Sequence, residues 1–143
     1  MSAEVFQWAA MVPELACSDL QTSLKFYVGA GGGRIEYERA GFAYLTIGLA
    51  QIMLEQAPND WPVGPLERPF GRGVNFQIEV ADVDTLAARL AAANVELYRE
   101  QSDKWYDAKG VLRGQRELLV QDPDGYLLRF HSVIGTRKVQ PQP

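Results

Sequence analysis

The acidic residues Glu14, Glu55 and Glu79 each lie in a short, mainly apolar run that could form a strand. If the three side chains face one cleft, partial burial and mutual repulsion would raise the pKa of one carboxyl group, which could then act as a general base without a metal. The same three carboxylates could instead attract a cation. The residue types leave both interpretations open.

Large aromatic residues stand between the expected strands. Trp61 lies in a stretch rich in Pro and Gly, and Trp105 and Tyr106 lie in a charged segment that the sequence predicts to be a loop. Large aromatic side chains in loops are costly to expose, so they cover the edge of a core or stack on a ligand or partner. All three are therefore candidates for ligand contacts.

Other chemistries find little support. His131 is the only histidine, so one chain cannot build a two-histidine-one-carboxylate iron site or a histidine-rich zinc site, and no nucleophile elbow accompanies it. Residues 29–33 are glycine-rich but follow a predicted helix, which indicates a helix-ending loop and not a phosphate loop. Cys17 is the only cysteine and lies in an apolar run, so we expect a buried structural thiol and no internal disulfide.

Composition limits the partners. The chain has 143 residues, of which 47% are hydrophobic, and a formal net charge of −4. Such a chain can form a core, and its charge argues against nucleic acid or an anionic membrane as a partner and favours a cationic ligand. Glu4 stands where a signal peptide would be positively charged, and no long apolar run follows. We therefore predict a cytoplasmic protein.

The elements that must position these residues form an internal repeat. In the first half an extended run over residues 12–17 leads through Ser18-Asp19, a helix N-cap, into a helix that ends at the glycine-rich loop. In the second half an extended run over 75–80 leads through the N-cap Asp82 into a helix that ends near Asn94. Extended segments follow each helix, over 34–39, 42–47 and 51–56 in the first half, and over 96–100, 117–121 and 126–132 in the second.

Both halves therefore have the order βαβββ. We expect an N-terminal arm over 1–11, a first module over 12–57, a linker over 58–73, a second module over 74–133 and a loose tail over 134–143. One helix can cover only one face of each sheet, so the strands should alternate between a packed and an open face. The residues expected on the open face include Glu14, Glu55, Asn75, Gln77, Glu79, Arg129 and His131.

Several motifs together resemble a known family. They are Ser18-Asp19-Leu20 with Ser23-Leu24 and Phe26-Tyr27, the run from Phe76 to Val80 with Asp82-Val83-Asp84, and the run from Asp122 to Phe130. Their order, spacing and duplication are similar to the glyoxalase/bleomycin-resistance/dioxygenase superfamily. The resemblance implies an α+β fold in which two tandem βαβββ modules form a curled mixed sheet, and it implies that the open polar strand faces line a concave cleft.

The resemblance also implies where a metal would be held. Metal enzymes of the superfamily place ligands at positions that correspond here to Val12, Glu55, Asn75 and Arg129. Glu55 alone is a good ligand, because valine has no donor atom, an amide is a weak ligand and Arg129 brings a permanent positive charge. We therefore predict no metal and no cofactor. As a further hypothesis, Arg129 pairs with Glu55 and places a protein cation where the metal would be.

The leading interpretation is a homodimeric protein similar to bleomycin-resistance proteins. Such a protein binds a small cationic or aromatic molecule, an antibiotic among them, by sequestration. The alternative is a lyase, isomerase or ring-cleavage dioxygenase that uses Glu55 with a displaced metal, or Glu79 as a metal-free base. A third interpretation is a structural or regulatory subunit whose cleft is filled by its own aromatic side chains. The predicted ligand-binding residues are Glu14, Glu55, Asn75, Gln77, Glu79, Trp61, Trp105, Tyr106 and Arg129.

Overall fold

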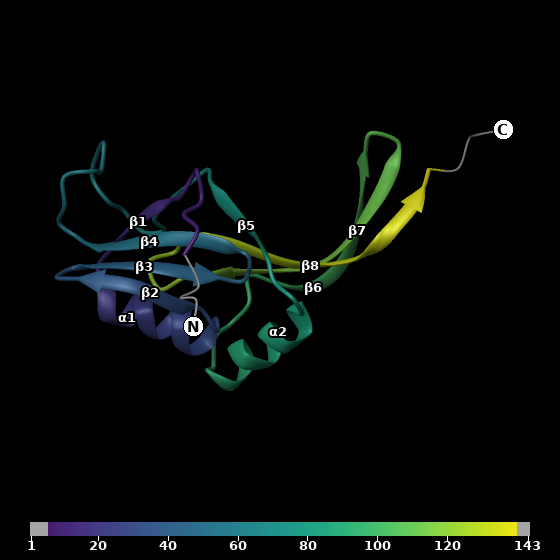
Figure 1. Ribbon diagram of the computed structural model, residues 1–143. Helices are drawn as coiled ribbons and strands as arrows, with labels where there is room; N and C mark the ends of the chain where they lie inside the picture. Colours follow the sequence, from purple (N-terminus) through teal and green to yellow (C-terminus); the bar gives the residue numbers. More distant parts are fainter. Residues whose placement is uncertain (1–5, 140–143) are drawn as a thin grey trace, which may run out of the picture.

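The computed structural model describes residues 6–139, so the first five residues of the predicted arm and the last four of the predicted tail lie outside the described part. Two helices and two four-stranded sheets follow one another in the order βαβββ, twice (Figure 1). This confirms the predicted α+β fold of two tandem modules. The elements are β1 Glu14–Cys17, α1 Leu20–Leu24, which continues as the π-helical η1 Lys25–Ala30, β2 Arg34–Arg39, β3 Phe42–Ile47, β4 Ala50–Gln56, β5 Asn75–Glu79, α2 Val83–Ala92, β6 Arg99–Ala108, β7 Val111–Gln121 and β8 Leu127–Lys138.

The two helices begin at equivalent aspartates. Asp19 and Asp82 both have extended backbone, and each side chain accepts a hydrogen bond from a backbone N–H two residues later. These bonds satisfy amide groups that have no partner inside the helix. The first helix ends at Gly31, where the chain passes close to its own backbone. A Cβ atom at Gly31 would lie 2.7 Å from the carbonyl oxygen of Tyr27. The second ends before Asn94, which has a φ of 58°.

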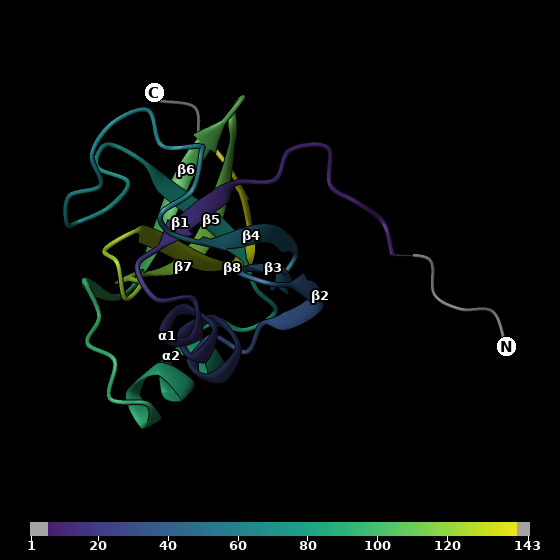
Figure 2. The same ribbon diagram turned by 90° about the vertical axis from the view of Figure 1, so that its left-hand side faces the viewer.

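Both sheets have the same topology. The first has the strand order β1-β4-β3-β2 and the second β5-β8-β7-β6, and in each sheet the first strand runs parallel to its neighbour while the other pairs are antiparallel. Both helices lie on the same side of the strands (Figures 1 and 2). Alternate strand residues point to that side, as shown by the buried Leu15 and Cys17 beside the exposed Glu14. The opposite faces of β1 and β4 carry polar residues such as Glu14 and Glu55, whereas that of β3 carries aromatic side chains, Phe42 among them.

Buried polar contacts join the two modules. The Tyr27 hydroxyl on the first helix donates to the Asp122 carboxylate at 2.8 Å, and the Tyr126 hydroxyl donates to the Ala16 carbonyl at 3.1 Å. Burial raises the pKa of Asp122 to about 6, although hydrogen bonds from Tyr27 and two backbone N–H groups oppose that rise. Core residues from both modules form one cluster around these contacts. The modules therefore share a single core.

The second sheet is longer than the sequence predicts. β6 and β7 form a hairpin whose turn, Lys109-Gly110, has positive φ at both residues, and β8 continues to Lys138 beside them. The expected boundary of the second module at residue 133 is therefore exceeded by five residues of strand. The ends of these strands project away from the helices (Figure 1).

This difference has a physical reason. Nine of the ten residues of β6 are exposed, so its sequence lacks the alternation of apolar and polar residues that marks a half-buried strand. Pairing with β7 through backbone hydrogen bonds forms the strand nevertheless. Trp105 and Tyr106, expected in a loop, thus lie on β6, where consecutive side chains point to opposite faces. Within residues 6–139, no helix has the length and apolar character needed to cross a membrane.

Candidate ligand-binding site

Two predicted acidic residues meet on the open face of the first sheet. Ala16 of β1 pairs with Glu55 of β4, which places Glu14 diagonally next to Glu55. Partial burial raises the pKa of Glu14 to about 7, and a hydrogen bond and charge repulsion from Glu55 act in the same direction. Arg39 opposes the shift, but its guanidinium lies 3.8 Å from the centre of the Phe42 ring and forms a cation-π contact there. At pH 7 the Glu14 carboxyl group is therefore about half protonated.

Trp61 completes this site from the linker. Its indole Nε1 donates a hydrogen bond to Glu55 Oε2 at 3.0 Å. The side chain is largely exposed and stands at the edge of a small pocket of about 140 Å³, which we call the acidic pocket. An exposed indole beside two carboxylates can stack on a flat cation. The acidic pocket is lined by Glu14, Ala16, Asn59, Trp61, Pro62, Leu66 and Tyr126.

The N-terminal arm covers another part of the same sheet face. The rings of Phe6 and Trp8 lie edge-on to Tyr44, with centroids at 5.6 and 5.0 Å, and Gln51 holds the arm through hydrogen bonds to the backbone of Gln7 and Ala9. Tyr44 is buried as a result, while Trp8 remains 61% exposed. The arm therefore fills part of the open face with aromatic side chains of the chain itself and does not line the acidic pocket.

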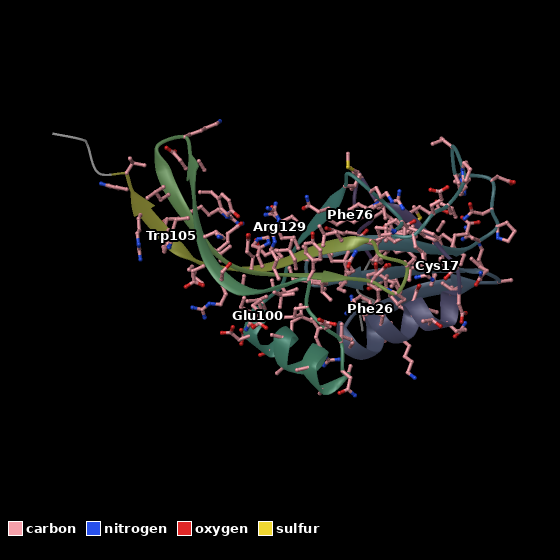
Figure 3. All side chains as sticks on the ribbon, turned by 180° about the vertical axis from the view of Figure 1, so that it is seen from behind. Cys17, Phe26, Phe76, Glu100, Trp105 and Arg129 are labelled. Atoms are coloured by element: carbon pink, nitrogen blue, oxygen red, sulfur yellow. The ribbon has the colours of Figure 1, made fainter. Side chains whose placement is uncertain are left out.

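The remaining polar residues form a second cluster on the open face of the second sheet. Gln77 of β5 accepts a hydrogen bond from the Arg129 guanidinium and donates to Gln115 of β7 at 3.4 Å. Glu79, at the end of β5, forms an ion pair with Arg113 at 3.2 Å. Figure 3 shows Arg129 on the side of the sheet opposite the helices. Gln77, Glu79 and Arg129 thus share one face, as the alternation predicts.

The hypothesis of an Arg129–Glu55 ion pair is wrong. Within residues 6–139, Arg129 has no carboxylate within 4.0 Å, and Glu55 accepts its hydrogen bond from Trp61. The reason is topological, because Arg129 lies beside Gln77 in a parallel strand pair of the second sheet, and Glu55 belongs to the first sheet. The guanidinium instead donates to Gln77, an acceptor within its own sheet.

Tyr106 and Trp105 are separated by the alternation of β6. The Tyr106 hydroxyl donates to both carboxylate oxygens of Glu117, at 2.9 and 3.0 Å, so Tyr106 belongs to the second cluster. Trp105 lies across Gly114 on the other face, beneath the guanidinium of Arg137 at 3.8 Å from its ring centre. Figure 3 shows Trp105 in the projecting part of the sheet, away from Arg129.

The predicted ligand-binding residues therefore form two groups. Glu14 and Trp61 line the acidic pocket, Glu55 stands beside it through its hydrogen bond from Trp61, and Gln77, Glu79, Tyr106 and Arg129 belong to the second cluster. In the described part of the chain, no hydrogen bond or ion pair links the two groups. Asn75 lines a larger, mainly apolar cavity of about 420 Å³ between the arm, β4 and β5, together with Ala9, Met11, Val12, Pro13, Leu49, Ala50, Gln51, Ile52, Phe76, Gln77 and Ile78.

The four positions at which the superfamily would place metal ligands do not fit a metal. Val12 and Asn75 line the apolar cavity, Glu55 is bonded to Trp61, and Arg129 is bonded to an amide. Among residues 6–139, no three His, Cys, Asp or Glu side chains are grouped closely enough to hold a metal ion. These residues offer one carboxylate where a metal needs several oxygen, nitrogen or sulfur donors.

Three residues of the second cluster were not predicted as ligand contacts. Arg113, Gln115 and Glu117 all lie on β7 and face the same side as His131. The sequence contains part of this signal, because the polar residues 113, 115 and 117 are spaced two apart, as residues on one face of a strand are. The expected strand began only at residue 117, so that alternation was not extended to the hairpin.

The duplicated βαβββ unit with an open polar face defines a class of paired-module proteins. The chain belongs to the Glyoxalase/Bleomycin resistance protein/Dioxygenase superfamily, whose sequence profile matches residues 7–130. Bleomycin resistance proteins of Geobacillus stearothermophilus and Staphylococcus aureus are each 28% identical to it over 134 residues, which cover 86% of this chain and 96% of the relative.

Solved structures agree on the fold. TioX from Micromonospora sp. ML1 superposes with a TM-score of 0.64 at 24% identity and covers 92% of this chain and 100% of its own. A glyoxalase/bleomycin resistance protein/dioxygenase from Nocardioides superposes with a TM-score of 0.63 at 20% identity and covers 98% of this chain and 93% of its own.

Proposed function

We propose that this chain is a cytoplasmic, homodimeric binding protein that sequesters a small cationic or aromatic molecule without a metal. The acidic pocket is the observation that carries the proposal. Two carboxyl groups lie side by side there, the pKa of Glu14 is raised to about 7, and a cation can replace its proton, while the exposed Trp61 indole offers a stacking surface. The similarity to proteins named bleomycin resistance protein makes a large cationic antibiotic the first ligand to test.

We propose a dimer because the acidic pocket and the second cluster lie apart within one chain. In a symmetric dimer, the acidic pocket of one copy can face the second cluster of the other, and together they would enclose a larger ligand than either could hold. The projecting ends of β7 and β8 carry the exposed apolar residues Val111, Val133 and Ile134, which a second copy could cover. Sedimentation velocity tests the oligomeric state directly, and a monomer at micromolar concentration would contradict this part.

An enzymatic role is the second candidate, and one observation favours it. A carboxyl group with a pKa of about 7, such as that of Glu14, can take and return a proton at neutral pH. A lyase or isomerase of the superfamily could use it as a base. Turnover of a tested ligand that is lost in Glu14→Gln would favour this candidate over sequestration, which returns the ligand unchanged.

The decisive experiment is isothermal titration with metal-free bleomycin and, in parallel, with a quaternary aromatic ammonium ion. We expect binding that weakens about tenfold or more in Glu55→Gln, because the charged carboxylate beside Glu14 and Trp61 is lost. Glu100→Gln makes the same charge change on the exposed β6 and should bind like the unchanged protein. Equal affinity in both variants, or a stoichiometric metal after purification without chelator, would overturn the proposal.

A further inference from the structure

Three ionisable residues lie in one row across the open face of the second sheet. His131 of β8 pairs with Glu79 of β5 on one side and with Glu117 of β7 on the other. Paired residues in neighbouring strands project to the same face, so the imidazole lies between two carboxylates. His131 is 3% exposed and Glu117 is 6% exposed, whereas Glu79 lies nearer the solvent. We call this row the histidine subsite.

The imidazole of His131 lacks hydrogen bonds. Neither Nδ1 nor Nε2 has a partner among the described residues, although both atoms are buried. The nearest carboxylate oxygen, Oε1 of Glu79, is 3.6 Å from Nε2, which is too long for a hydrogen bond. Buried polar atoms are nearly always paired, and an unpaired one needs an explanation. Burial also lowers the pKa of His131, which favours the neutral ring, and in a neutral ring one of the two nitrogens is an acceptor.

Glu117 is a buried carboxylate that lacks a cationic partner in the part of the chain that the structure describes. Its carboxylate accepts two contacts from the Tyr106 hydroxyl, and within residues 6–139 it takes part in no ion pair. A buried carboxylate without a cation is costly. Arg113 lies nearby but pairs with Glu79, and Arg129 binds Gln77. The charged and titratable groups around His131 are thus Glu79, Tyr106, Arg113, Glu117 and Arg129.

The groups at the rim are easier to move than those beneath them. The side chains of Arg113 and Glu79 are 45% and 37% exposed, and an exposed ion pair of this kind contributes little to stability. Tyr106 is also partly exposed. A ligand can therefore displace the rim at small cost and reach the unpaired nitrogens of His131 and the Glu117 carboxylate, which Tyr106 contacts.

We propose that the histidine subsite binds the ammonium group of a small-molecule amine. An ammonium group has three N–H donors, and the subsite offers three acceptors, namely the Glu117 carboxylate, the neutral His131 ring and Glu79 once Arg113 moves aside. The positive charge compensates the buried Glu117. The inference rests on the proposed function in that the ligand is cationic, and it adds a second binding point in the other module, involving Glu117 and His131.

The sole histidine makes the test direct, because its ring gives one set of NMR signals. Butylammonium chloride should shift the His131 ring signals saturably at pH 7.5 in the presence of EDTA, and 1-butanol should not. In Glu117→Gln the affinity should fall about tenfold or more. In Tyr106→Phe it should rise, since the competing hydroxyl is gone and Glu117 is free. A merely structural role for Tyr106 would not increase amine affinity.

Several results would overturn the inference. They are an absent shift, an equal shift with 1-butanol, and unchanged affinity in Glu117→Gln. If Glu117→Gln does not fold, Tyr106→Phe decides alone, and no gain in affinity would count against the subsite. Glu55→Gln should leave the butylammonium response intact while it weakens bleomycin binding. The two proposals can therefore fail separately.

Discussion

The pH dependence of cation binding follows from the acidic pocket. Glu14 has a pKa of about 7, so its carboxyl group is mostly protonated at pH 6 and mostly ionised at pH 8. A cation that needs the ionised form must displace the proton, and its affinity should therefore rise with pH. An ordinary surface carboxyl group is already ionised at pH 6 and would add no pH dependence over this range.

The magnitude can be worked out from the same value. With a pKa of about 7, the ionised fraction is about 9% at pH 6 and about 91% at pH 8. Because apparent affinity is proportional to the binding-competent fraction, it should increase about tenfold over this range. The shift also means that the folded chain holds a proton that the unfolded chain has lost, so stability should decline as the pH rises from about 4.5 to 7.

The assay is isothermal titration with a quaternary aromatic ammonium ion, whose own charge does not change with pH. The control is Glu14→Gln, in which affinity should vary by less than about twofold between pH 6 and pH 8, because the titrating group is absent. A flat profile in the unchanged protein would refute the reasoning. A tenfold increase retained in Glu14→Gln would assign the titration to another group and refute it equally.

Two further predictions concern stability, each checked by urea unfolding. Tyr27→Phe removes a hydrogen bond to the buried Asp122 and should lower the free energy of unfolding by about 2 kcal/mol at pH 7.5. The loss should be smaller at pH 4.5, because Asp122 has a pKa of about 6 and is protonated there. Equal losses at both pH values would contradict this. Gly114→Ala would place a Cβ atom 2.6 Å from the Trp105 ring and should cost about 1–3 kcal/mol. In Trp105→Ala the cost should be smaller, because only the contact with Ile134 Cγ1 at 2.9 Å remains, and an undiminished cost there would argue against a clash with the Trp105 ring.

The sequence by itself determined the fold and the sidedness of the strands. The N-caps Asp19 and Asp82, the two helical periods and the alternation in residues 75–80 are local signals, and each is repeated at the same place in the second copy. Local signals suffice here because a βαβββ unit is built from short elements whose apolar faces must meet. The polar faces of β1, β4, β5 and β8 could be assigned for the same reason.

Only the tertiary structure decided which polar residues meet. The length of β6 and β7 depends on pairing between strands and leaves little trace in an exposed sequence. Arg129 binds Gln77 instead of Glu55 because strand neighbours compete at short range, and which strands are neighbours is a property of the whole sheet. The burial of Glu117 and His131 likewise arises from residues far apart in sequence. Contacts of this kind depend on three-dimensional proximity, which local patterns do not encode.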